Sequence, residues 1–331
     1  MTTMPLRPLG RSDLLVSAVG LGCNNFGRPG TATEEQSGTD RVLHAAIDYG
    51  ISLLDTAEMY GYEHGRSESM MGVALVGHRD RVVLATKFGH VDAKNPDQRD
   101  GAHGSRQYIR AAVEGSLRRL RTDRIDLYQL HTPDPETPID ETLSALHELV
   151  DEGKVLHLGH SNFSAGEVVE AERAATASGH PRFISAQNEY SLLVRDADAE
   201  LLPVLQRHGL GLLPYFPLSN GLFTGKFTRE GGPADSRIMR QRPHVVENAP
   251  WSVIEAFRAL AAERGIGMLE ATIGWLLSRP ALSSVIAGAT TQQQVAQNAA
   301  AATVWAPGAD DLALIDELFP APHAPEPIEH E

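Results

Sequence analysis

Short apolar segments alternate with longer amphipathic segments along almost the whole chain. Eight of the short segments are rich in β-branched or other apolar residues, which is typical of buried parallel strands. The longer segments repeat apolar residues at spacings of three and four, as in a helix with one buried face. This alternation predicts an α/β fold.

The predicted strands and helices pair off in order along the chain. The strands are Leu15–Gly20, Ile51–Asp55, Val82–Lys87, Ile125–His131, Val155–Ser161, Phe183–Asn188, Gly211–Tyr215 and Ser284–Gly288. The helices are Thr39–Tyr49, Ser67–Leu75, Ser105–Arg121, Ile139–Glu152, Ala165–Ser178, Ala197–Arg207, Trp251–Arg264 and Gln292–Ala302. A glycine follows several of them, and glycine commonly ends a helix in the left-handed conformation. These glycines are Gly50, Gly153, Gly179 and Gly209.

Eight strands, each followed by a helix, favour a closed (β/α)8 TIM barrel over a doubly wound open sheet, which is the alternative. Tyr215–Pro250 is too long for an ordinary connection and predicts a functional loop after the seventh strand. Asp310–Leu318 predicts an additional C-terminal helix. We expect one domain over residues 1–319 and a flexible tail over residues 320–331.

Composition and charge argue against several classes of protein. The 331 residues include 29 lysines and arginines against 43 aspartates and glutamates, which gives a formal net charge of −14. Such a balance does not favour binding to nucleic acid or to an anionic membrane. The single cysteine, Cys23, argues against a disulfide framework, and no spacing indicates a metal site. With no long apolar run and no signal-like segment at Met1–Gly10, we expect a soluble cytoplasmic protein.

Titratable side chains close three consecutive predicted strands. Asp55, Lys87 and His131 end the second, third and fourth strands, and Tyr60 follows Asp55 by five residues. Each has an ordinary role when taken alone: a turn former, a solvated lysine or a histidine bound to a carbonyl. Neighbouring parallel strands end at the same rim of a barrel, however, so these side chains can converge on one pocket.

Together, these four residues could form a proton donor. A phenol has a pKa of ~10, and a neighbouring cation lowers it. Lys87 could be that cation, held by Asp55, while His131 could hydrogen-bond the same oxygen. Tyr60 would then donate a proton to a carbonyl oxygen as negative charge develops there during reduction.

Two stretches carry a resemblance to a known family. The segment Gly50–Gly61, which reads GISLLDTAEMYG, with Gly65–Glu68 (GRSE), resembles the first signature of the aldo-keto reductases. Tyr128–His131, Gly153–Val155 and Ser161–Ser164 resemble the later signatures. The resemblance runs from about Leu9 to Asn298. It implies a (β/α)8 barrel, NAD(P)H-dependent carbonyl reduction and a catalytic tetrad of Asp55, Tyr60, Lys87 and His131.

The same resemblance implies a site for a nicotinamide cofactor, although the chain has no G-x-G-x-x-G fingerprint. Ser161, Asn162 and Gln187 would bind the carboxamide, and Tyr215 would stack on the ring. The loop after Tyr215 would bind the phosphates, and residues after the last strand would bind adenosine. The residues implied are Phe216, Pro217, Leu218, Asn220, Gly225 and Lys226 for the phosphates, and Gly288, Thr290, Gln294, Gln297 and Asn298 for adenosine.

The adenosine positions bear on the choice between the two nucleotides. Many members of the family place lysine or arginine between the positions that match Gly288 and Gln294, whereas this chain has threonine and glutamine. Charge-assisted contacts are the strong ones for phosphate. The absence of a cation here weakens the case for a strict preference for NADP(H). NADP(H) is still the favoured cofactor, and NAD(H) stays an alternative. Arg229 or Arg237 on the long loop could supply the missing cation.

The expected partner is a small aldehyde or ketone, and the oligomeric state is not predicted. The candidates to line its pocket are Asn24, Asn25, Phe26, Met59, Phe88, His90 and the loop Arg229–Arg242. Two other functions stay open. One is a cofactor-sensing binding module with vestigial catalysis, and the other is an aldolase that forms a Schiff base on Lys87.

Overall fold

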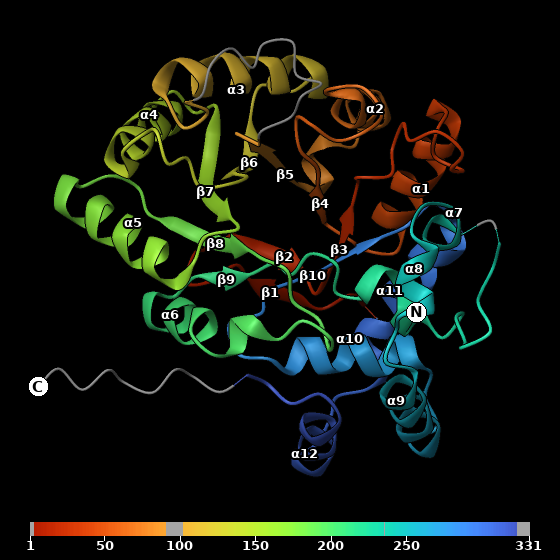
Figure 1. Ribbon diagram of the computed structural model, residues 1–331. Helices are drawn as coiled ribbons and strands as arrows, with labels where there is room; N and C mark the ends of the chain where they lie inside the picture. The colour runs from red at the N-terminus through yellow and green to blue at the C-terminus, as the bar shows by residue number, and fades with distance from the viewer. Residues whose placement is uncertain (1–2, 91–101, 235, 323–331) are drawn as a thin grey trace, which may run out of the picture.

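Eight parallel strands curve into a sheet with helices around its outside, as the computed structural model shows (Figure 1). The structure describes residues 3–90, 102–234 and 236–322. The order of the strands is β10-β3-β4-β5-β6-β7-β8-β9. Their bounds are β3 Val19–Gly22, β4 Leu53–Asp55, β5 Val83–Phe88, β6 Ile125–Leu130, β7 Val155–Ser161, β8 Phe183–Gln187, β9 Gly211–Leu212 and β10 Val285–Gly288.

Two backbone hydrogen bonds close this sheet between β9 and the residues just before β10. The Leu212 amide donates to the Ala281 carbonyl (2.7 Å), and the Ser283 amide donates to the Leu212 carbonyl (2.9 Å). Leu212 and Leu282 thereby pair in parallel. The predicted (β/α)8 barrel is confirmed, and the open sheet is excluded.

Helices follow the strands and form the outer layer (Figure 1). Their bounds are α1 Gln36–Asp48, α2 Arg66–Ala74, α3 Arg106–Leu120, α4 Ile139–Asp151, α5 Ala165–Ser178, α6 Leu201–His208, α7 Arg237–Gln241, α8 Pro243–Glu247, α9 Trp251–Glu263, α10 Met268–Ser278, α11 Gln292–Val304 and α12 Ala309–Leu318. In the described part of the chain, no helix is long and apolar enough to cross a membrane.

Local signals account for where some helices begin and end. Ser164 caps α5 through a reciprocal capping box with Glu167, and Gly179 ends it with a φ of 68°. Ser105 accepts a hydrogen bond from the Tyr108 amide at the start of α3. Such caps satisfy amide and carbonyl groups that a helix leaves unpaired at its ends.

The first predicted strand is wrong in its extent. The run Leu15–Gly20 divides at Ala18: Leu15–Ser17 (β2) pairs antiparallel with Leu6–Pro8 (β1), and only Val19–Gly22 enters the barrel. Ser17 and Ser52 exchange two bonds of 3.0 Å, each amide donating to the other hydroxyl. The chain therefore makes a hairpin before the barrel begins.

Other elements depart from the sequence prediction. Helix α10 was not predicted, although its residues are mostly buried. The predicted helix Ala197–Arg207 is a short 3-10 turn, η2 (Asp196–Asp198), followed by α6. The long connection after β9 contains the turn η3 (Ser219–Thr224) and the helices α7 and α8. The expected tail lies mostly outside the described residues.

The core has two parts on either side of the sheet. A small cluster fills the barrel, and the hairpin residues Leu9 and Val16 contribute to it. The larger cluster packs the outer helices on the sheet. Polar side chains instead gather at the carboxyl ends of the strands, where the predicted site lies.

Candidate active site

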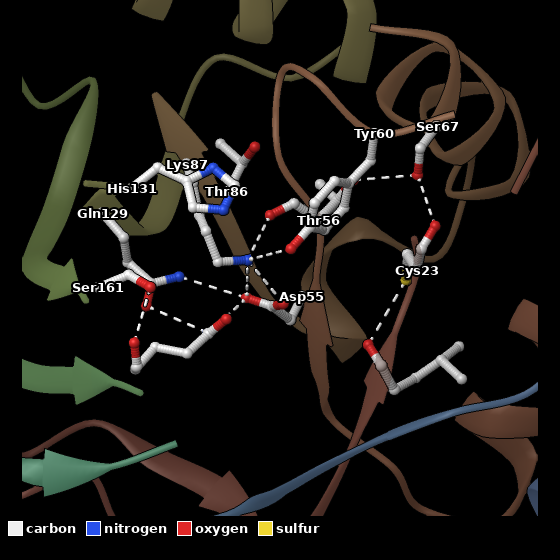
Figure 2. Close-up of polar contacts among 12 residues, drawn as sticks. Cys23, Asp55, Thr56, Tyr60, Ser67, Thr86, Lys87, Gln129, His131 and Ser161 are labelled. Carbon is white, nitrogen blue, oxygen red and sulfur yellow. Dashed lines mark hydrogen bonds and ion pairs between the residues drawn. The ribbon is translucent and has the colours of Figure 1, made fainter. Parts of the chain in front are cut away.

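An ion pair joins the ends of β4 and β5. The Lys87 ammonium donates to both oxygens of Asp55, each at 2.7 Å, and to the Thr56 carbonyl at 2.9 Å (Figure 2). The Lys87 side chain has no exposed surface, and that of Asp55 is 3% exposed. The two residues come together because β4 and β5 are adjacent parallel strands.

The Lys87 side chain is held in its charged form. Burial alone lowers the pKa of this amine, but the charges of Asp55 and Tyr60 and their hydrogen bonds raise it above its ordinary value. A permanently protonated lysine is a source of positive charge and a poor nucleophile.

Tyr60 lies directly beside this ammonium, as predicted. Its hydroxyl is 3.5 Å from the Lys87 Nζ atom, and that atom is 4.9 Å from the centre of the phenol ring. The expected direction of the pKa shift is wrong, however. Burial raises the pKa of Tyr60 above 10, and the Asp55 charge adds to it, which outweighs the lowering by Lys87 and Asn24. The phenol is therefore held protonated.

His131 follows β6 and faces the phenol edge to face. The two ring centres are 5.8 Å apart, at an angle of 79°. Burial is the main reason that the pKa of His131 lies far below its usual value, and the charges of Lys87 and His90 lower it further. The ring is therefore neutral. Its buried Nδ1 atom has no hydrogen-bond partner among the described residues. The expected hydrogen bond to Tyr60 is not formed in this structure.

Asp55 also accepts hydrogen bonds from two buried amides. Gln187 donates to its Oδ1 atom at 3.0 Å, and Gln129 donates to the same atom at 3.3 Å. The Gln187 amide is thus engaged with the ion pair, although the family resemblance implied a carboxamide contact. Gln129 was not singled out from the sequence. It lies two residues before His131 in a buried strand, and no pattern distinguishes it there.

Residues at the ends of β7 and β9 form a second polar group next to the ion pair. Asn162 donates to the His131 carbonyl (2.9 Å) and to the Ser161 hydroxyl (3.1 Å), and it accepts from the Tyr215 hydroxyl (2.9 Å). Ser161 donates to the Gln187 carbonyl (2.7 Å). Asn162 has a φ of 63°, which turns the chain at the end of β7. This group connects the predicted carboxamide residues to the tetrad.

The predicted phosphate loop has an unusual backbone. Phe216, Ser219, Asn220, Gly221 and Gly225 all have positive φ values, so the chain turns repeatedly between β9 and α7. Phe216 is 38% exposed, whereas Pro217 is buried and Leu218 packs against the core. Gly225 and Lys226 are exposed. Of the predicted set, Phe216, Gly225 and Lys226 are therefore open to solvent.

The predicted adenosine residues contact one another at the start of α11. The Thr290 amide donates to the Gln294 side chain at 2.7 Å, and Thr291 caps the helix. Asn298 donates to the Gly288 carbonyl at 3.5 Å. Residues 288–298, which include Gln297, contain no lysine or arginine. Arg229, one of the two proposed compensating residues, pairs with Glu255 at 3.1 Å.

A cavity of about 270 Å³ opens beside Tyr60. It is lined by Asn24, Arg28, Pro29, Met59, Tyr60, Gly61, Tyr62 and Gln241. Met59, one of the predicted substrate residues, thus lines a cavity next to Tyr60. Asn25 does not line this cavity, and its buried Oδ1 atom has no partner among the described residues.

Two of the predicted substrate residues are instead core residues. Phe26 and Phe88 have no exposed surface, and the Phe88 ring stacks on Tyr128 at 4.6 Å between centres. Phe88 follows Lys87 in β5, and successive residues of a strand point to opposite sides. Phe26 lies in the turn after β3, and both phenylalanines belong to the outer core. We correct these two assignments.

Glu58 is a buried residue to which the sequence analysis gave no role. Its Oε1 atom accepts from the Gly89 amide (2.9 Å) and from the Tyr108 hydroxyl (2.7 Å). Burial raises the pKa of this carboxyl group to about 7, more than its hydrogen bonds lower it. Glu58 fixes the segment that carries Tyr60 to the end of β5 and to α3.

The fold and the site together define a class of protein: a (β/α)8 barrel with Asp55, Tyr60, Lys87 and His131 at the carboxyl ends of its strands. Comparison with known proteins gives the family. The profile of the Aldo/keto reductase family matches residues 18–319. The chain therefore belongs to the Aldo/keto reductase family. The family resemblance stated from the sequence is confirmed.

Named relatives include enzymes and channel subunits. An uncharacterized oxidoreductase of Bacillus subtilis, YrpG, is 35% identical, over 96% of this chain and 97% of that protein. L-Glyceraldehyde 3-phosphate reductase of Escherichia coli (strain K12) is 32% identical, over 95% and 92%. A probable voltage-gated potassium channel subunit beta of Oryza sativa subsp. japonica is 33% identical, over 89% and 90%. The family and the oxidoreductase names support an oxidoreductase that acts on carbonyl compounds.

Proposed function

We propose that this protein reduces a small aldehyde or ketone to the alcohol with NAD(P)H, and that Tyr60 is the proton donor. The observation that carries the proposal is the contact of the Tyr60 hydroxyl with the buried Lys87–Asp55 pair at the edge of a cavity. Bound NAD(P)H supplies the hydride. The protein must supply the proton and stabilise charge on the carbonyl oxygen.

The chain's own residues divide this task. Tyr60 gives its hydroxyl proton to the carbonyl oxygen, and the adjacent Lys87 ammonium stabilises the phenolate that remains. Asp55 keeps Lys87 charged and oriented through two hydrogen bonds. His131, which is neutral, can donate a hydrogen bond to the same carbonyl oxygen without competing as an acid. The high pKa of Tyr60 keeps the proton in place until charge develops.

The donor set next to the tetrad fits a nicotinamide. Ser161 and Asn162 present a hydroxyl and an amide, and half-buried Tyr215 presents an aromatic ring hydrogen-bonded to Asn162. Ordered hydroxyls and amides are suitable partners for a carboxamide. In this proposal Lys226 and the loop before it hold the phosphates, and Thr290, Gln294, Gln297 and Asn298 hold the adenosine. NADP(H) is favoured by the family resemblance. NAD(H) stays the alternative, because residues 288–298 offer no cation to a 2′-phosphate.

The other two functions fit the site less well. An aldolase needs a lysine that loses its proton easily, but Asp55 raises the pKa of Lys87 against the effect of burial. A binding module without catalysis does not need an ordered proton donor, and here all four tetrad residues meet. The channel-subunit relatives keep the binding module as the second candidate.

Turnover with purified protein tests the proposal. NADPH or NADH oxidation is followed with a panel of aldehydes and ketones, for the wild type, Tyr60→Phe and the control Tyr49→Phe. Tyr49 is 42% exposed at the end of α1. We expect Tyr60→Phe to reduce kcat by about 10²- to 10⁴-fold, the range typical of a lost general acid, and Tyr49→Phe to have no effect.

Cofactor titration by fluorescence separates the two candidate functions. A binding module would bind the reduced nucleotide but oxidise none of it with any carbonyl compound. Equal turnover by Tyr60→Phe and the wild type would remove Tyr60 as the proton donor. The ratio of the NADPH and NADH dissociation constants gives the preferred nucleotide directly.

A further inference from the structure

The predicted phosphate loop, residues 216–226, has a strained backbone. Ser219 and Asn220 have φ values of 46° and 59° within the turn η3, and Phe216 before it has a φ of 50°. Residues other than glycine adopt this left-handed region at a cost in free energy, and they keep it only where the surrounding structure enforces it. The phosphate loop therefore needs contacts from other parts of the chain to keep its shape.

A cluster of buried aromatic rings supplies one such contact. Phe223 of η3, Phe257 of α9 and Phe319, the residue after α12, pack edge to face on one another, with ring centres 5.7, 5.7 and 5.6 Å apart. Phe223 and Phe257 have no exposed surface, and Phe319 is 4% exposed. The end of α12 is thus packed directly against the phosphate loop.

Arg195, in the segment after β8, fixes the position of Phe319. Its Nη1 atom donates to the Phe319 carbonyl at 2.5 Å and to the Asp316 carboxylate at 2.6 Å. Its Nε atom donates to the Asp198 carboxylate at 2.7 Å, and the guanidinium lies 5.5 Å from the centre of the Trp275 ring. The side chain of Arg195 is only 5% exposed. Charge-assisted hydrogen bonds of this kind are strong, so Arg195 holds the end of α12 in place.

The segment that carries Arg195 also contacts the phosphate loop itself. The hydroxyl groups of Ser191 and Ser219 form a buried hydrogen bond of 3.0 Å. The Tyr190 amide donates to the carbonyl of Tyr215, the residue before the phosphate loop, at 3.4 Å. One connected set of contacts therefore joins α12, the segment after β8 and the phosphate loop.

We propose that Arg195 and Phe319 are positioning residues for the cofactor, which hold η3 in the backbone conformation that receives the phosphates of the dinucleotide. This inference rests on the proposed function, which assigns residues 216–226 to these phosphates. Neither side chain lines the cavity beside Tyr60, so both act through Phe223 and its neighbours. A loop that is ordered before binding loses less conformational entropy when the nucleotide binds. Loss of either contact should therefore weaken nucleotide binding without slowing the chemical step.

The nucleotide affinity of Arg195→Met tests this role. We would measure the dissociation constants of NADPH and NADH by fluorescence, at a temperature at which melting curves show each variant to be folded, and kcat at saturating nucleotide. Arg195→Met should raise the dissociation constant of the preferred nucleotide by about tenfold, because the binding-competent loop is populated less. Its kcat at saturating nucleotide should not fall. Arg195→Lys keeps a charged donor and should recover part of the affinity.

Arg264→Met is the matched control, since it removes another arginine that attaches α12. The Nε atom of Arg264 donates to Asp311 in the first turn of α12 at 2.9 Å, at the opposite end of the helix from Phe319. This variant should bind the nucleotide as the wild type does. Wild-type affinity in Arg195→Met, or an equal loss in Arg195→Met and Arg264→Met, would overturn the inference and leave the proposed function standing.

Phe319→Leu tests the same contact without removing a buried charge, so it decides if Arg195→Met does not fold. It leaves the bonds of Arg195 to Asp316 and Asp198 in place. Its dissociation constant for the nucleotide should also rise. In the nucleotide-free protein, the Gly221 and Phe223 amides, which donate to the Leu218 carbonyl, should exchange faster than in Arg264→Met. Wild-type affinity in Phe319→Leu, or equal exchange in the two variants, would overturn the inference.

Binding and turnover distinguish failure of this inference from failure of the proposed function. A wild type that binds a reduced nucleotide but reduces no carbonyl compound would remove the proposed reaction only, and the dissociation constants of the variants would still decide the inference. A wild type that binds neither NADPH nor NADH would overturn both.

Discussion

The Asp55 carboxylate is shared by three buried donors, and Lys87 is the only cation among them. Lys87, Gln187 and Gln129 all donate to its Oδ1 atom. A carboxylate that is 3% exposed depends on such partners, because burial of an unpaired charge is costly. The same pair therefore carries both stability and the proposed catalysis.

We predict that Lys87→Met lowers both the free energy of unfolding and kcat. Removing one partner of a buried pair costs about 3–5 kcal/mol, since Asp55 is left charged without its cation. The double variant Asp55→Asn/Lys87→Met should regain part of this stability but none of the activity. Urea denaturation and turnover with the best aldehyde of the panel measure the two effects.

Lys154→Met is the control for the loss of a lysine. Lys154 is 31% exposed and pairs with Glu114 and Glu152 at the surface. Such exposed pairs contribute about 0–1 kcal/mol. If Lys87→Met were as stable as this control, the Lys87–Asp55 pair would not have the proposed structural role.

The sequence predicted the positions of the tetrad better than its electrostatics. Asp55, Lys87 and His131 could be located because strand ends in a barrel share one rim. The direction of the pKa shift of Tyr60 could not be predicted, because it depends on how deeply the ring is buried and on a second charge at Asp55. Phe26 and Phe88 were misassigned for a similar reason. Proximity to a strand end does not say which side of the loop a ring faces.

At the scale of elements, one buried carboxyl group holds the segment between β4 and α2. Glu58 accepts hydrogen bonds from the end of β5 and from α3, and its own amide donates to the Lys87 carbonyl at 3.0 Å. Because Tyr60 is two residues away, this attachment helps fix the position of the phenol relative to Lys87.

Glu58 makes the folded state less stable as the pH rises. Its pKa is about 7 in the folded protein and about 4.5 in an unfolded chain, so the folded state holds a proton that the unfolded state releases between these values. Stability falls as the pH rises from 4.5 to 7, by about 3 kcal/mol at ~1.4 kcal/mol per unit. Below pH 4.5 both states are protonated, and the penalty vanishes.

We predict that Glu58→Gln removes much of this penalty. The glutamine oxygen can accept from Gly89 and Tyr108, which both donate to Oε1 in the wild type. The difference in Tm between the variant and the wild type should therefore increase from pH 5 to pH 8. Glu63→Gln, an exposed change on the same segment, is the control and should show no such trend. A Tm difference that is constant with pH would contradict the prediction.

The boundaries of elements were predictable only where local signals mark them. Helix α5 has its capping box and terminal glycine in the sequence. The division of Leu15–Gly20 has no local signal, because a continuous apolar run does not reveal which residues pair with Leu6–Pro8 and which enter the barrel. Helix α10 lacks a polar face, since eight of its residues are buried, and this hid its helical period.

At the scale of the molecule, the barrel closes at its shortest strand, β9. Strand β9 has two residues, whereas β6 has six and β7 has seven. Closure next to β9 relies on the two hydrogen bonds that Leu212 makes with Ala281 and Ser283. The number and order of the strands could be predicted from the sequence. The contact of β9 with residues 281–283, which we call the seam, could not be predicted, because it is a property of the closed sheet.

We predict that the seam opens more readily than the rest of the barrel. Amide hydrogens of Leu212 and Ser283 should exchange at least about tenfold faster than those in the middle of β6, a difference of about 1.4 kcal/mol in opening free energy. Native-state hydrogen exchange with fragment or NMR detection measures these rates. Equal protection of the seam and β6 would show that closure is as stable as the strand interiors.

The hairpin of β1 and β2 gives the barrel two unlike ends. Met4, just before β1, packs near Gly50, which precedes β4, so the hairpin lies at the opposite end of the barrel from Asp55 and Tyr60. A support or fluorescent reporter coupled through an exposed hairpin position such as Leu6 or Leu15 would consequently point the catalytic mouth toward bulk solution. Immobilised in that orientation, the protein should admit carbonyl compounds without obstruction by the surface that carries it.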